Sequence, residues 1–213
     1  MNWILSGIML TSFTVLGSSR ITTRIKAIAV QGALLASLQF LMGGSVFDFH
    51  SSILLIVTLA VKTAIVPLLI FRATKGTSQQ SRKAPIMGNH LLLLIASVIA
   101  IISFLNIKSF PLPPPGGASP LLIPVALTTV LVGFLALVAR TKATNQILGF
   151  VVLENGVFAF GMTIISQFPF LVEIGVLLDV LAGIFIMGII TYHINKTFDN
   201  IDTRELSALG DHE

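Results

Sequence analysis

Seven long apolar stretches, separated by short polar segments, dominate the pattern of the chain. A helix needs roughly 20 mostly apolar residues to cross about 30 Å of hydrocarbon. Strand-like alternation is absent, and these runs are too long for barrel strands, so helices are the elements that can satisfy their backbone in lipid. We therefore predict an all-α, polytopic membrane helical bundle of about seven transmembrane helices. The stretches cover residues 2–18, 27–46, 52–71, 87–106, 120–139, 147–165 and 171–192.

The positive charges predict the direction of these spans. Of the 13 Lys and Arg residues, eleven lie in alternate connecting segments, and the opposite set of connections holds only Lys108. The remaining one, Lys62, lies inside a span. Because cytoplasmic loops carry an excess of Lys and Arg, we expect the N-terminus outside and the C-terminus in the cytoplasm.

Composition excludes several classes of protein. Hydrophobic residues make up 54% of the chain and charged residues 10%, whereas soluble domains carry about 25% charged residues. The chain has no cysteine, which excludes thiolate metal sites, iron–sulfur ligation and cysteine nucleophiles. Its four histidines are scattered, so we expect neither a metal site nor a redox centre in this chain. The net charge of +4 follows from the basic loops and does not indicate a nucleic-acid partner.

One break in composition divides the chain. Residues 107–119 are rich in proline and glycine and cannot be helical. We interpret them as an external linker between a four-helix N-terminal part (1–106) and a three-helix part (120–192). Residues 193–213 form a predicted cytoplasmic tail.

Four ionisable residues fall inside the predicted spans: Lys62, Glu154, Glu173 and Asp179. All except Glu173, at the outer end of its span, lie near the predicted midplane, where a charge costs about 2.5–3.5 kcal/mol. One interpretation is structural: Lys62 pairs with Glu154 or Asp179 and locks the bundle. The other is a proton relay, because intramembrane groups of both signs are typical of proton pathways.

Three segments resemble component E of hydrogenase-4. They are residues 148–156 (LGFVVLENG), residues 171–179 with the motif VEIG followed by Leu178 and Asp179, and residues 61–67 (VKTAIVP). That family belongs to the membrane arm of energy-converting, formate-hydrogenlyase-type nickel–iron hydrogenases. More distantly, residues 120–192 are similar to subunit K of respiratory complex I and to the C component of Mrp-type antiporters. The resemblance implies that this chain lies in a prokaryotic cytoplasmic (inner) membrane.

The resemblance implies roles for particular residues. In the subunit K family, each of the last two helices carries a membrane-embedded glutamate. Glu154 stands at the first of these positions and Asp179 at the second, where aspartate keeps the carboxylate and shortens its reach. Lys62 and Glu173 are further candidates for proton translocation.

We therefore predict a multi-pass membrane subunit of a complex-I-related hydrogenase complex that conducts protons or Na⁺ and is not an enzyme by itself. The nickel–iron and iron–sulfur centres would lie in a peripheral hydrogenase module, and the other partners would be antiporter-like membrane subunits. The alternatives are a subunit of an Mrp-like cation/proton antiporter without redox activity, and a purely structural helix bundle.

Overall fold

The computed structural model describes most of the first six predicted spans. Within the described residues the chain is all-helical and contains no strand. The predicted linker at 107–119, the seventh span at 171–192 and the tail at 193–213 fall almost wholly outside them. The described residues are 1–42, 60–75, 87–106, 119–140, 143–163, 183, 187 and 188.

A helix forms in each of the first six predicted spans, which confirms the all-α prediction for this part of the chain. The third span combines a short π-helix, η1, with an α-helix that continues it without interruption. The elements are α1 (Asn2–Gly17), α2 (Ile21–Met42), η1 (Val61–Ile65), α4 (Val66–Lys75), α5 (Asn89–Leu105), α6 (Leu122–Ala139) and α7 (Ala143–Gly161).

Two of the described helices are long and apolar enough to cross a membrane, namely α2 and α6. At 1.5 Å per residue, their 22 and 18 residues extend over about 33 and 27 Å, close to the thickness of the hydrocarbon layer. Helices α1 and α5 are apolar and slightly shorter. The count of seven spans and their orientation stay predictions.

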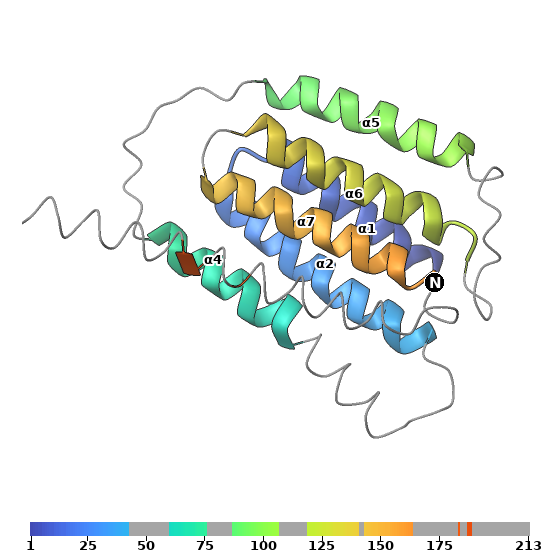
Figure 1. Ribbon diagram of the computed structural model, residues 1–213, viewed down its shortest axis with the longest axis horizontal. Helices are drawn as coiled ribbons and strands as arrows, with labels where there is room; N and C mark the ends of the chain where they lie inside the picture. The colour runs from blue at the N-terminus through green and yellow to red at the C-terminus, as the bar shows by residue number, and fades with distance from the viewer. Residues whose placement is uncertain are drawn as a thin grey trace, which may run out of the picture.

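The helices lie side by side with their axes roughly aligned (Figure 1). Helices α1, α2, α6 and α7 form the centre of the bundle, and α6 packs against α7 over its whole length. Helix α5 lies against α6 and α1, whereas the η1–α4 segment lies against α2 and α7, so the two flank the centre on different sides. This arrangement brings η1 next to α7, although the two are far apart in sequence.

The outer surface of α5 is apolar as well as its inner one. Leu92 and Ala96 are fully buried against α1 and α6, while Leu94, Ile101 and Leu105 are 61%, 59% and 75% exposed. A helix that is hydrophobic all round is typical of a membrane span or the core of a large assembly. The exposed side of α5 therefore fits contact with lipid or with another subunit.

Helices α2 and α7 begin earlier than hydrophobicity predicts. We expected spans from 27 and 147, whereas the helices start at Ile21 and Ala143. The apolar stretches mark the part of each helix predicted to lie in hydrocarbon, whereas helical hydrogen bonding continues into the polar residues before it, so the helices begin earlier than the stretches. Arg24 shows how: it stays inside α2 because its guanidinium folds back to donate to the Ser18 carbonyl.

A clamp of polar side chains ties the helix ends together where α1 finishes. Arg140 Nη2 donates to the Leu16 carbonyl at 2.8 Å and to Asn89 Oδ1 at 3.0 Å. Asn89 Nδ2 donates to the Gly17 carbonyl at 3.1 Å. These bonds satisfy carbonyls that the last turn of a helix leaves open. Burial lowers the pKa of Arg140 from its ordinary value, but a guanidinium keeps its charge at neutral pH.

Candidate functional site

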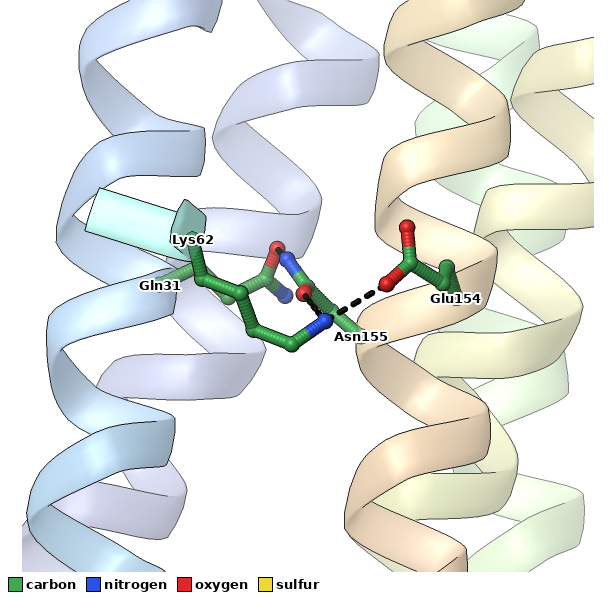
Figure 2. Close-up of polar contacts among 4 residues, drawn as sticks. All are labelled: Gln31, Lys62, Glu154 and Asn155. Carbon is green, nitrogen blue, oxygen red and sulfur yellow. Dashed lines mark hydrogen bonds and ion pairs between the residues drawn. The ribbon is translucent and has the colours of Figure 1, made fainter. Parts of the chain in front are cut away.

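A buried ion pair joins η1 to α7. Lys62 Nζ lies 2.6 Å from Glu154 Oε1, and each side chain is only 3% exposed (Figure 2). The sequence offered Glu154 or Asp179 as the partner of Lys62, and the structure shows the pair with Glu154. Glu154 is the one acidic residue within the described part of the chain.

The π-helical turn has a local cause in Pro67. Proline has no N–H, and its ring clashes with the carbonyl four residues earlier in an α-helix. Here the turn before Pro67 is widened, because the Val66 N–H donates to the Val61 carbonyl five residues back. Single π-turns inside helices are frequent at functional sites. Lys62 lies in this widened turn.

A glycine on α2 allows η1 to approach closely. A Cβ atom on Gly32 would lie 2.7 Å from the Lys62 carbonyl oxygen and 2.8 Å from its carbonyl carbon. Both atoms belong to the backbone, so a larger residue could be accommodated only by moving η1. Gly32 therefore sets how closely η1 approaches α2, and with it the position of the Lys62 backbone from which the side chain extends.

A chain of neutral polar side chains runs from the ion pair across the bundle. Lys62 Nζ donates to Asn155 Oδ1 at 3.4 Å, and Asn155 Nδ2 donates to Gln31 Oε1 at 3.2 Å (Figure 2). Gln31 Nε2 donates to Ser12 Oγ at 2.9 Å, and this hydroxyl donates to the Ile8 carbonyl at 2.9 Å. The chain links η1, α7, α2 and α1. Each group in the chain donates to the next, from Lys62 to the Ile8 carbonyl. Because the Asn155 nitrogen donates to Gln31, the Asn155 oxygen faces the ammonium.

An aromatic ring completes the surroundings of the ammonium. Lys62 Nζ lies 5.0 Å from the centre of the Phe158 ring, within the range of a cation–π contact. Phe158 follows Glu154 by one helical turn of α7, so both side chains point to the same face. One face of α7 thus supplies the carboxylate and the ring, while the adjacent Asn155 supplies the amide.

Close packing of α7 on α6 holds this face in place. A Cβ on Gly156 would lie 2.5 Å from the Val130 nitrogen. On the facing helix, a Cβ on Gly133 would collide with the backbone of Leu153. Small residues at such positions let helix backbones approach each other closely. The residues that flank Glu154 on α7 therefore rest directly on the α6 backbone.

The structure brings together two of the four predicted site residues, Lys62 and Glu154. The other two, Glu173 and Asp179, lie outside the described residues. Sequence reasoning missed the amide chain of Ser12, Gln31 and Asn155. A sequence signal for Gln31 existed, since it is a polar side chain in the middle of an apolar stretch. The structure shows that this side chain is fully buried.

The arrangement places two groups that can each bind a proton, one on η1 and one on α7, within hydrogen-bond distance of each other. The carboxylate of Glu154 can accept one proton, and the ammonium of Lys62 can release one and offers three N–H groups as hydrogen-bond donors. An ammonium that loses its carboxylate partner still has an amide oxygen and an aromatic face within reach. Together, fold and site define a helical bundle with a hydrogen-bonded ion pair buried at mid-helix.

Comparison with known proteins identifies relatives of the same general length. An uncharacterized protein of Mycobacterium tuberculosis is 27% identical over 210 residues, which cover 96% of this chain and 93% of that protein. Hydrogenase-4 component E of Escherichia coli K12 is 28% identical over 148 residues, or 70% of this chain and 68% of that protein. The same component of Shigella flexneri matches equally well.

Hydrogenase-4 component E is therefore a homologue of this chain, and the resemblance inferred from the sequence motifs is confirmed. No family model and no solved structure matches the chain.

Proposed function

We propose that this protein is a multi-pass membrane subunit of a complex-I-related, energy-converting hydrogenase complex, and that Lys62 and Glu154 take part in its proton translocation. The homology to hydrogenase-4 component E supports a membrane subunit of a hydrogenase complex. The observation that carries the finer proposal is the buried Lys62–Glu154 pair. In this proposal Glu173 and Asp179 extend the path on the last helix.

The ion pair has a purely structural explanation as well, and the neighbouring side chains favour the functional one. Neutral side chains such as Ser, Asn and Gln hold membrane helices together at a lower desolvation cost than charges. Gln31, Asn155 and Ser12 already join three helices at this level. Lys62 adds η1 to these helices, a link that a neutral side chain could also make, so the distinguishing property of the charged pair is that it can gain and lose protons.

Glu154→Gln tests the role in proton translocation. Glutamine keeps the volume and a polar end that can accept a hydrogen bond from Lys62, but it cannot take up or release a proton. We expect the complex to assemble and electron transfer to lose its coupling to proton uptake in membrane vesicles.

The measurement is subunit abundance beside proton uptake, for Glu154→Gln and for Lys62→Met. Normal abundance with normal uptake in both variants would contradict the proposed relay. Depletion of both variants from the membrane would instead support a structural lock, since breaking a buried pair typically costs about 3–5 kcal/mol.

Copurification tests membership of the complex. We expect nickel–iron and iron–sulfur proteins to copurify with the tagged chain from membranes. Recovery of antiporter-like subunits without any redox protein would favour an antiporter instead.

A further inference from the structure

The position beside the Glu154 carboxylate is occupied by a cation that belongs to the protein. Lys62 Nζ lies 2.6 Å from the carboxylate oxygen and 3.4 Å from the Asn155 amide oxygen. The Phe158 ring faces the same ammonium at 5.0 Å. Carboxylate and amide oxygens are also ligands of hard metal cations, and aromatic faces attract cations in general. The site therefore has the chemistry of a cation-binding site, and its cation is the Lys62 ammonium, which is covalently attached to the protein.

The tethered ammonium is held in place from two sides. On the backbone side, the Lys62 carbonyl rests against Gly32 with no room for a Cβ atom. On the other side, the amide of Asn155 is oriented by Gln31, which is in turn fixed by Ser12. The Lys62 side chain is only 3% exposed, so displacement of the ammonium would move a charge within a buried region and would break its bonds to Glu154 and Asn155.

The geometry points to Lys62 as the residue that excludes Na⁺ and other metal cations from Glu154, so that the site exchanges protons only. This inference rests on the proposed function, in which Glu154 exchanges an ion. A proton binds to one carboxylate oxygen and needs no further ligands. A metal cation needs several oxygen ligands, and here at least two oxygens already face the ammonium. It would also stand next to a positive charge in a medium of low dielectric, where repulsion is strong.

Carbodiimide labelling of Glu154 tests this selectivity at the site itself. Dicyclohexylcarbodiimide reacts with protonated carboxyl groups in membranes, so a metal cation bound to the carboxylate slows the labelling. The rate is measured at Glu154 by peptide mass spectrometry, on membranes that hold the whole complex. NaCl replaces choline chloride at constant ionic strength and constant pH.

We expect the labelling rate in the unmodified protein to fall as pH rises and to be the same with Na⁺ as with choline. A rate that decreases with Na⁺ alone would overturn the inference. In Lys62→Met the tethered cation is gone, and we expect Na⁺ to slow the labelling several-fold. In Lys62→Arg a tethered cation remains, and Na⁺ should have no effect.

Insensitivity to Na⁺ in Lys62→Met would also overturn the inference, because something other than Lys62 would then exclude the metal. Lys62→Gln replaces this variant if the methionine form does not accumulate. The result is separate from the proton-uptake test. If Na⁺ slows the labelling of the unmodified protein and Glu154→Gln uncouples proton uptake, the inference about cation selectivity is wrong but the proposed function stands. Normal proton uptake in Glu154→Gln removes the proposed function, whatever the labelling shows.

Discussion

Replacement of Gly32 by alanine tests whether the position of Lys62 depends on the close approach of η1 to α2. The new Cβ would lie 2.7 Å from the Lys62 carbonyl oxygen, whereas ordinary contact begins at 3.4 Å. The backbone of η1 would have to retreat by the difference, about 0.7 Å, and forced overpacking of this kind costs about 1–3 kcal/mol. A displacement of nearly 1 Å at a reacting group can also lower a rate by about 10²-fold. We expect Gly32→Ala to lower proton uptake more than it lowers abundance.

Gly7→Ala is the matched control for this experiment. Gly7 also lies inside a helix, so both variants share the gain of about 0.5–1 kcal/mol that alanine brings over glycine there. The nearest atoms to its Cβ would all belong to the Leu34 side chain, with Cδ1 the closest at 2.9 Å, and this end of a flexible side chain can rotate away. The difference between the two variants therefore isolates the contact with Lys62.

The assay is the thermal midpoint of the detergent-solubilised complex, read beside proton uptake in vesicles. Gly32→Ala should melt at a lower temperature than Gly7→Ala, and the uptake of the control should stay close to that of the unmodified protein. Equal midpoints and equal uptake in the two variants would refute the reasoning, because η1 would then not rest on Gly32.

Three further predictions concern the amide chain, the clamp at the end of α1 and the topology. Gln31→Leu leaves the buried Asn155 amide without its acceptor and should destabilise the protein by about 1–3 kcal/mol. Its control is Ser37→Ala, an exposed position on the same helix, which should change stability by no more than about 0.5 kcal/mol. The thermal midpoints of the two variants measure the difference. Arg140→Met removes charged hydrogen bonds and should lower stability by about 1.5–3 kcal/mol, with the exposed Arg72→Met as its near-neutral control in the same melting assay. A reporter fused to the C-terminus should read cytoplasmic and one inserted at 113–117 external, and two reporters on the same side would contradict seven spans.

The sequence predicted that Lys62 has an acidic partner, because an unpaired charge inside an apolar span is energetically costly. A lysine in the middle of an apolar span must be compensated, and the pattern restricted the partner of Lys62 to Glu154 or Asp179. Choosing between them depends on how the helices are rotated about their axes. Hydrophobicity does not determine this rotation when most of the helix surface is apolar, so the sequence left both partners open.

The pairing of Gln31 with Asn155 could not be predicted for the same reason, although Gln31 alone stands out as a polar residue in an apolar stretch. Gln31 and Asn155 are 124 positions apart, and no periodicity relates them. The π-turn at Lys62 was equally out of reach, although Pro67 signalled a local departure from α-helix. Pro67 explains why a wider turn forms, whereas the position of that turn beside α2 depends on the close contact with Gly32, which is a tertiary contact.

The separation of Lys62 and Glu154 along the chain has a consequence for biosynthesis. The two residues are 92 positions apart, and ribosomes add about 5–20 residues per second. The segment with Lys62 is therefore made about 5 to 18 s before its counter-ion exists. In the proposed membrane subunit, the Lys62 ammonium lacks this carboxylate throughout that interval. The ion pair that joins η1 to α7 can form only after α7 has been made, so the packing of the first half of the bundle is completed by the second.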